Sequence, residues 1–220
     1  MIASRDLRCQ HAPDRAPLAF PDVDVPQGGV LLLSGGAAAG KSSWLALAAG
    51  LLAPASGELR VAGETPASLA PAARNAWRLR AVGVLPPSAP VNPALTVRAN
   101  LALAFLAMGV REDRWAITQA LAAVQMDSLA NMPGRELTAF HTRRVALARA
   151  WLLNPQVLLL DEPVAGLPAD EAPLLLAWVK GWAGDKGCTV VIATRAPDAA
   201  RAVFPQAQAL ELLAPQHSAL

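Results

Sequence analysis

The residues best suited to chemistry are the consecutive eight Gly35-Gly36-Ala37-Ala38-Ala39-Gly40-Lys41-Ser42, which match the pattern G-x-x-x-x-G-K-[ST]. The apolar run 30–33 before them predicts a buried strand, and 43–49 after them predict a helix that ends near Gly50. In this arrangement, backbone N–H groups and the positive end of the helix attract phosphate. We expect residues 35–42, with Ser43, to bind a nucleotide: Lys41 contacts its β- and γ-phosphates and Ser42 binds Mg²⁺. A glycine turn without a ligand is the alternative, and the Gly-Lys-Ser ending in this context disfavours it.

Two adjacent carboxylates end a second apolar run. Residues 156–160 predict a strand that is buried on both faces of a parallel sheet, with Asp161 and Glu162 at its carboxyl end. We expect Asp161 to hold Mg²⁺ directly or through water, and Glu162 to act as the general base that polarises the attacking water. Acids that only terminate a strand are the alternative, which the phosphate-binding loop disfavours.

Length and composition bound the class of protein. The 220 residues suffice for one domain, or for one domain with a subdomain. Hydrophobic residues make up 54% of the chain, but the longest apolar stretch, 101–110, is far shorter than the roughly 20 residues of a membrane-spanning helix. The first residues show no signal-peptide pattern, and a net charge of +2 does not indicate nucleic-acid binding. We expect Cys9 and Cys188 to be small buried residues in a reducing compartment.

Periodicity predicts alternating strands and helices with a helical block between them. The block covers about 96–150, and 97–108 and 112–124 are its clearest helices. The remaining predicted elements are strands at 7–9, 18–25, 58–61, 81–85, 189–193 and 207–212, and helices at 170–182 and 197–203. This order implies an α/β core with an inserted or appended helical subdomain.

The run Arg143-Arg144-Val145-Ala146-Leu147-Ala148-Arg149-Ala150-Trp151-Leu152-Leu153-Asn154-Pro155, which leads into the Asp161-Glu162 strand, resembles ATP-binding cassette (ABC) ATPases that power transporters. It looks like the helix that follows the family's signature sequence, and residues 137–141 stand where the family has Leu-Ser-Gly-Gly-Gln. Read without the family, 143–153 is an amphipathic helix with a solvated arginine face. The resemblance covers nearly the whole chain. It implies one nucleotide-binding domain over 1–220, with a RecA-like P-loop NTPase core of mainly parallel strands, an N-terminal antiparallel β subdomain and an α-helical subdomain at about 90–150.

The chain departs from the family at two positions near the expected γ-phosphate. Pro86 stands where members place a glutamine that contacts Mg²⁺ and the water, and Arg195 stands where they have a switch histidine. Proline has no side-chain oxygen, and further prolines at 87, 90 and 93 predict a stiffened loop. We expect Arg195 to contact the γ-phosphate as a cation, without histidine's neutral donor and acceptor roles.

The signature and the adenine contact depart as well. Ala139 and Phe140 replace glycines that let the backbone approach the γ-phosphate of the opposite subunit, and we expect the phenyl ring to hinder that approach. The chain has no tyrosine to stack on adenine. His11 is the best-placed substitute and Phe20 the second, although either residue would also suit a loop or the core.

The resemblance implies an ATP-binding subunit of an ABC transporter that uses ATP and Mg²⁺, with impaired hydrolysis. It further implies a head-to-tail homodimer or heterodimer, separate transmembrane permease subunits in a groove beside 86–95, and a peripheral place on the cytoplasmic face of the cell membrane. Motifs at 143–163 look most like those of subunits in bacterial envelope lipid or lipoprotein traffic. Two alternatives stay open: a nucleotide-binding structural or regulatory subunit without significant hydrolysis, and a phosphate-loop small-molecule kinase, which the 143–163 block disfavours.

Overall fold

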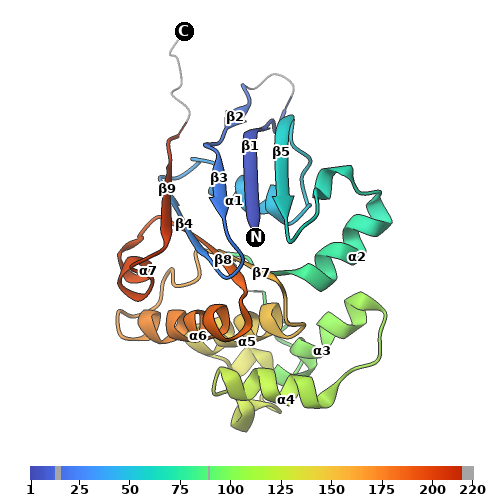
Figure 1. Cartoon of the computed structure of the whole chain (residues 1–220). Helices are drawn as coiled ribbons and strands as arrows, with labels where there is room; N and C mark the ends of the chain where they lie inside the picture. The colour runs from blue at the N-terminus through green and yellow to red at the C-terminus, as the bar shows by residue number, and fades with distance from the viewer. Residues whose placement is uncertain (13–15, 89, 215–220) are drawn as a thin grey trace.

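The antiparallel sheet forms the upper part of the molecule in Figure 1, where the computed structural model describes residues 1–12, 16–88 and 90–214. Within these ranges β1 (Ile2–Cys9) pairs antiparallel with each of the other three strands. Those three strands are β2 (Leu18–Ala19), β3 (Val23–Val25) and β5 (Ser56–Val61).

The second sheet is parallel in every pairing that the described residues make. Its strands lie in the order β6 (Val82–Leu85), β7 (Val157–Asp161), β8 (Thr189–Thr194), β4 (Val30–Gly35) and β9 (Gln208–Leu212). Every residue of β7 and β8 is buried, as expected for strands that are covered on both faces. Because the strands are parallel, the chain leaves β4, β7 and β8 at one common edge.

The described part of the chain contains seven α-helices. They are α1 (Lys41–Ala48), α2 (Pro71–Ala81), α3 (Val97–Met108), α4 (Arg114–Ala123), α5 (Ala139–Trp151), α6 (Glu171–Lys186) and α7 (Asp198–Val203). Short 3₁₀ turns lie at Pro66–Ser68, Asp127–Leu129 and Gly134–Glu136. In Figure 1, α3, α4 and α5 lie at the opposite end of the molecule from the antiparallel sheet.

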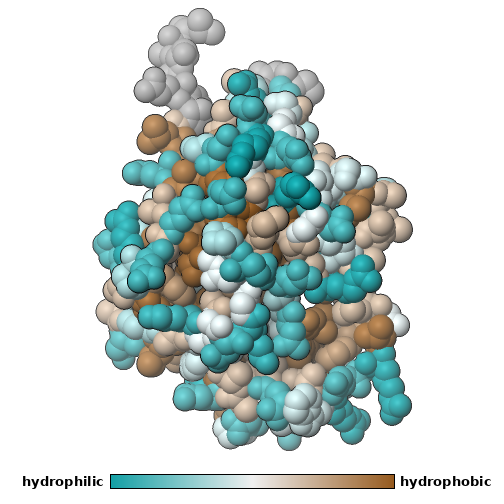
Figure 2. Space-filling view, in the orientation of Figure 1, coloured by the Kyte–Doolittle hydropathy of each residue, from teal (hydrophilic) through white to brown (hydrophobic). Residues whose placement is uncertain are grey.

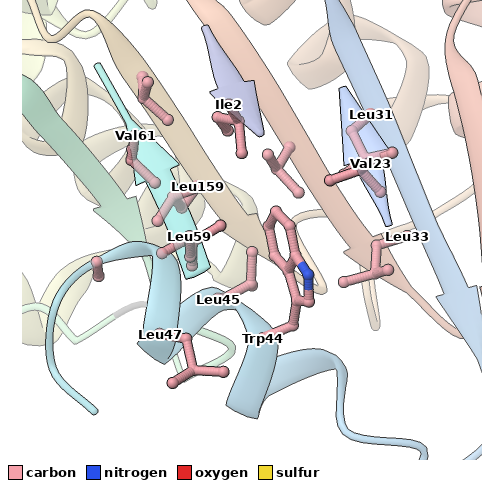
Figure 3. Close-up of a cluster of buried hydrophobic side chains, with 14 of the residues drawn as sticks. Ile2, Val23, Leu31, Leu33, Trp44, Leu45, Leu47, Leu59, Val61 and Leu159 are labelled. Atoms are coloured by element: carbon pink, nitrogen blue, oxygen red, sulfur yellow. The ribbon is translucent and has the colours of Figure 1, made fainter. Parts of the chain in front are cut away.

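Helix α1 lies between the two sheets and fills the largest apolar core. Trp44 is fully buried there, together with side chains from both sheets, such as Ile2 and Leu159. Figure 3 shows the indole of Trp44 pointing into this cluster from α1, beside Leu45. The helix that starts at the phosphate-binding loop is therefore held by apolar packing along its buried face.

The helical layer, which consists of α3, α4 and α5, has an apolar core of its own. Its buried residues come largely from α3, α4 and α5, and Val97, Leu101 and Ile117 are fully buried among them. Each of these helices begins at a side-chain cap, because Thr96, Asp113 and Thr138 accept a hydrogen bond from the third residue beyond. The helical layer is thus built from local helix starts and one shared core.

Aromatic stacking joins this layer to α6 beside the parallel sheet. The rings of Trp151 (α5) and Trp182 (α6) lie 4.7 Å apart at an interplanar angle of 8°.

Figure 2 shows one face of the molecule, on which hydrophilic and hydrophobic side chains are interspersed. Large exposed apolar residues include Leu106, Val110 and Trp115, which lie in or beside α3 and α4.

The structure confirms the predicted fold class: a parallel core sheet, an antiparallel sheet and a helical block. Cys9 and Cys188 are both buried and free, as predicted. No helix within the described ranges is long and apolar enough to cross a membrane. Helix α2 was not predicted: its sequence is polar on average, and only Trp77 and Ala81 are buried on it. A proline at the first helical position, Pro71, marks its start.

Replacing Trp44 with alanine tests the core around α1. Removal of a fully buried indole should lower the free energy of unfolding by about 3–5 kcal/mol, measured by chemical denaturation. Trp44→Phe should cost less, because the indole N–H has no hydrogen-bond partner among the described residues and phenylalanine removes it. Trp115→Ala is the matched control, since Trp115 is 72% exposed and its loss should change stability by only about 0.5 kcal/mol. Equal losses for Trp44→Ala and Trp115→Ala would contradict this account of the core.

Candidate functional site

The phosphate-binding loop connects β4 to α1, and its backbone requires glycine at its last position. Gly40 has φ +92°, and a Cβ there would lie 3.0 Å from a ring carbon of Phe20. Its carbonyl accepts the first helical hydrogen bond of α1, from the N–H of Trp44 at 2.8 Å. Ala38 has φ +60°, which costs a residue with a side chain about 1–3 kcal/mol. The loop therefore holds strained backbone at the expected phosphate position.

Lys41 is held over this loop rather than extended into solvent. Its side chain starts from the first residue of α1, and the residue is only 7% exposed. Its Nζ donates to the carbonyl oxygens of Gly35 at 2.7 Å and Gly36 at 3.0 Å. The ammonium group thus lies beside the backbone that the sequence analysis assigned to phosphate.

Ser42 and Asp161 meet across the edge of the parallel sheet. The Ser42 hydroxyl donates to Asp161 Oδ2 at 2.6 Å, although the two residues are 119 positions apart. Burial is the largest cause that raises the pKa of Asp161 above its ordinary value, and the nearby Glu162 charge raises it further. The hydrogen bond from Ser42 and the charge of Lys41 act in the opposite direction.

The donor set of these two residues fits Mg²⁺. A hydroxyl and a carboxylate are hard oxygen ligands, and Mg²⁺ is commonly bound by one or two carboxylates with substrate phosphates and water. The described residues contain no cluster of three or more His, Cys, Asp or Glu side chains that could hold a metal ion. The remaining ligands would therefore come from the nucleotide and from water.

Glu162 lies next to Asp161, and the end of β8 holds its carboxylate. The residue has φ +48°, and its N–H donates to Ala193 O at 2.8 Å. Glu162 Oε2 accepts from the hydroxyl of Thr194 at 3.2 Å. Glu162 Oε1 accepts from the Arg195 backbone N–H at 3.1 Å and from Arg195 Nε at 3.2 Å. The structure therefore brings Arg195 to the predicted general base.

The two candidates for stacking on adenine differ in exposure. His11 is exposed and its Nε2 lies 2.8 Å from Ser43 Oγ at the start of α1. Phe20 is only 5% exposed and belongs to the apolar core, beneath Gly40. Of the two, His11 offers a ring surface beside the loop, and Phe20 is a core residue.

The altered signature lies at the start of α5. The Thr138 hydroxyl caps this helix by accepting from the N–H of His141 at 3.2 Å. The ring of Phe140 stacks on Trp178 of α6 with centroids 6.3 Å apart, and the guanidinium carbon of Arg144 lies 5.2 Å from each ring centroid. The phenyl ring is therefore directed toward α6 of the same chain, and its predicted obstruction of a partner subunit stays a prediction.

The proline-rich loop after β6 is fastened to two helices. Pro86 follows β6 directly, and Arg149 of α5 donates from Nη2 to the carbonyl of Pro90 at 2.5 Å. The buried Asn100 accepts from the N–H of Asn92 at 2.7 Å and donates to its carbonyl at 3.1 Å. These contacts tie the described part of the loop to α3 and α5, and its stiffness stays a prediction.

Sequence reasoning missed Thr194, Asn100 and the Arg149 contact. An asparagine within a mostly apolar predicted helix was the signal for Asn100. Thr194 is the last residue of β8, directly before Arg195, so its hydroxyl lies at the edge of the sheet where the site forms. No local pattern marks the pairing of either residue with its distant partner.

Comparison with known proteins places this geometry among transporter ATPases. The family model described as ABC transporter matches residues 20–165. The chain is 31% identical to the lipoprotein-releasing system ATP-binding protein LolD of Chromohalobacter salexigens over 80% of this chain and 75% of that protein. It is 34% identical to the thiamine import ATP-binding protein ThiQ of Photobacterium profundum over 80% and 72%. It is also 33% identical to the spermidine/putrescine import protein PotA of Methylococcus capsulatus, over 88% of this chain but 49% of that longer protein.

Solved structures agree in fold. The chain superposes on the dimeric structure of MJ0796, a bacterial ABC transporter cassette, with a TM-score of 0.84 and 22% identity, over 97% of this chain and 94% of that one. For a post-hydrolysis state of MJ0796 with ADP and Pi the TM-score is 0.81 and the identity 21%, over 91% and 90%. With the family model covering the phosphate loop and the Asp161-Glu162 strand, this chain belongs to the ABC transporter family, as an ATP-binding subunit.

Proposed function

We propose that this chain couples ATP binding, and weak ATP hydrolysis, to separate membrane-spanning subunits of a transporter. The observation that carries the proposal is the 2.6 Å hydrogen bond between Ser42 and Asp161. It joins the phosphate-binding loop to the acid-bearing strand and brings a hydroxyl and a carboxylate together, which supports their proposed role as Mg²⁺ ligands. The proposed domain is the whole of residues 1–220, with the helical subdomain at about 90–150.

Each part of the site takes one role in this proposal. The N–H groups of 35–43 and Lys41 bind the phosphates, and His11 lies against the adenine. Ser42 and Asp161 hold Mg²⁺, which neutralises charge on the phosphates when it is bound. Glu162 polarises the water that attacks the γ-phosphate.

The proposed hydrolysis is weak because two groups of the family's machinery are replaced. Pro86 offers no side-chain oxygen to the water, and Arg195 has no neutral imidazole. Loss of one transition-state contact commonly costs about 10²–10³ in rate. Binding is retained, because the loop, Lys41 and Asp161 carry most of the phosphate and Mg²⁺ affinity.

The proposed assembly is a head-to-tail dimer, of identical chains or with another ABC ATPase, on permease subunits at the cytoplasmic face of the membrane. A cavity of about 200 Å³ lies between α2, β6, α3, α5 and the segment that leads from α5 into β7. Apolar residues line it, and Arg78 and Arg149 do as well. A permease segment with an apolar face and acidic or carbonyl oxygens would complement this cavity, whereas a net charge of +2 gives no support to nucleic acid.

For the cargo we propose lipid or lipoprotein of the bacterial envelope. The likeness to LolD, a lipoprotein-releasing protein, supports it. Relatives that import thiamine or polyamines have 33–34% identity, so identification of the lipid and subunits in the purified complex is the deciding experiment. A complex without lipid that contains a solute-binding subunit would contradict this part of the proposal.

One observation favours a second candidate, a regulatory subunit that binds nucleotide without significant hydrolysis. Arg195 is bonded to the carboxylate of Glu162 in this structure, so one oxygen of the proposed base is engaged and is less available to water. A small-molecule kinase is disfavoured by membership of the ABC transporter family.

Lys41→Ala tests nucleotide binding. Loss of the ammonium group should weaken ATP binding by about tenfold or more, because charge-assisted contacts to phosphate are among the strong hydrogen bonds. Titration of labelled ATP against the purified protein measures this. Lys180→Ala is a matched control, since Lys180 is an exposed residue of α6 outside the site. Equal affinity in the wild type and Lys41→Ala would refute the binding role.

Asp161→Asn should stabilise the nucleotide-free protein while it weakens Mg²⁺-dependent ATP binding. The raised pKa means that the folded state prefers the protonated carboxyl, so ionisation lowers the stability of the wild type. The stability advantage of the variant should therefore be full above this raised pKa and vanish as the pH falls below the ordinary value of aspartate. Thermal unfolding across pH, with ATP titration with and without Mg²⁺, measures both effects. A variant that is less stable at every pH would contradict the burial argument.

Glu162→Gln tests the chemical step. Glutamine keeps the shape of glutamate but cannot take up a proton from water, so ATP turnover by the assembled complex should fall by about 10²-fold. Phosphate release measures turnover, and ATP titration shows whether binding is kept. Unchanged turnover would place the chemistry in another subunit, or give this chain the regulatory role.

A further inference from the structure

We propose that Arg195 restrains the general base: it holds the Glu162 carboxylate by an ion pair and thereby slows ATP hydrolysis, instead of contacting the nucleotide. The inference rests on the proposed function, because it assigns a restraint to the same catalytic glutamate. It replaces the role that the sequence analysis gave to Arg195. In this view Arg195 is a positioning residue that acts through Glu162.

The hydrogen bonds around the carboxylate carry the proposal. Two oxygens offer about four lone-pair sites. Three donor groups make four contacts with them: the Arg195 N–H at 3.1 and 3.3 Å, Arg195 Nε at 3.2 Å and the Thr194 hydroxyl at 3.2 Å. A general base must accept a hydrogen bond from water before it takes the proton. The site on Oε1 that Arg195 Nε occupies is therefore withheld from water until the guanidinium moves.

Differences in mobility decide which partner must move. The Glu162 backbone is fixed, because its N–H donates to Ala193 O at 2.8 Å. The glutamate side chain is 15% exposed, whereas the arginine side chain is 64% exposed and reaches the pair from solvent. Arg195 can thus swing away without disturbing the sheet, and Glu162 cannot.

The ion pair is weak, so it should slow ATP hydrolysis without abolishing it. Ion pairs with an exposed partner are worth little, because water screens them and the long side chain loses freedom. In the described part of the chain, Arg195 is the basic side chain within 4.0 Å of Glu162. The charge of Glu162 also acts on Arg143, whose Nη2 donates instead to Ala165 O at 3.3 Å, while Lys41 is bound to its own loop. Arg195 is therefore the group to remove.

Arg195→Gln tests the restraint in the full-length chain, within its purified complex, with Mg²⁺ and ATP. Loss of the ion pair should raise kcat by about 2- to 5-fold and change the Kd for ATP by less than about 2-fold. Arg195→Lys keeps the charge but loses the Nε donor, so its kcat should lie between those of the wild type and Arg195→Gln. The matched control is Arg201→Gln, which removes the same charge from an exposed residue of α7 and should leave kcat unchanged.

A second readout needs no nucleotide. In the nucleotide-free chain, the Nε–H of Arg195 should exchange with solvent several-fold more slowly in the wild type than in Glu162→Ala, measured by ¹⁵N NMR. Equal exchange would overturn the ion pair. A Glu162→Ala variant that fails to fold is replaced by Glu162→Gln, whose neutral amide should also speed exchange.

The outcomes separate this inference from the proposed function. Arg195→Gln that lowers kcat and weakens ATP binding by tenfold would make Arg195 a nucleotide ligand and overturn the restraint. An unchanged kcat would also overturn the restraint, while Lys41-dependent ATP binding would leave the proposed function intact. No hydrolysis in any variant would overturn both the restraint and the proposed weak hydrolysis, and would favour the regulatory subunit. Equal ATP affinity of the wild type and Lys41→Ala would instead overturn the proposed function, and slow Nε–H exchange would still show the ion pair.

Discussion

The parallel pairing of β8 between β4 and β7 is the constraint on which the site depends. Ser34 pairs with Thr194 in one register and Asp161 with Ala193 in the other, so the three strands end at the same level. Neither the loop after β4 nor the two acids at the end of β7 could form a site alone. A slip of one strand by one residue would turn its side chains to the opposite face and separate Ser42 from Asp161.

Local patterns made the ends of this site predictable. The Gly-Lys-Ser sequence and its flanking residues predict a strand, a loop and a helix without a distant partner, and the short apolar run before Asp161 predicts a buried strand. Contacts between distant segments were not predictable in the same way. Three contacts join residues whose separation is set by the whole fold: Arg195 with Glu162, Asn100 with Asn92, and Phe140 with Trp178. Helix α2 escaped prediction because its sequence is polar on average and only two of its residues, Trp77 and Ala81, are buried.

The site concentrates features that oppose stability. Ala38 and Glu162 have left-handed backbone, and Asp161 is buried with a raised pKa. Each is tolerated because packing fixes the elements around it. Trp44 anchors α1 in the core, and β7 and β8 are buried along their whole length. The apolar composition of this chain thus supports a polar, strained edge.

The aromatic seam between α5 and α6 has a mechanical consequence. Trp151 packs on Trp182 at one point of the seam, and Phe140 packs on Trp178 at another, with Arg144 over both of the latter rings. Because α5 and α6 touch at two separated points, rotation of one helix against the other is resisted, and we expect the two helices to move together. Because α6 also packs on the parallel sheet, a displacement of α5 would be passed through α6 to the strands beneath it.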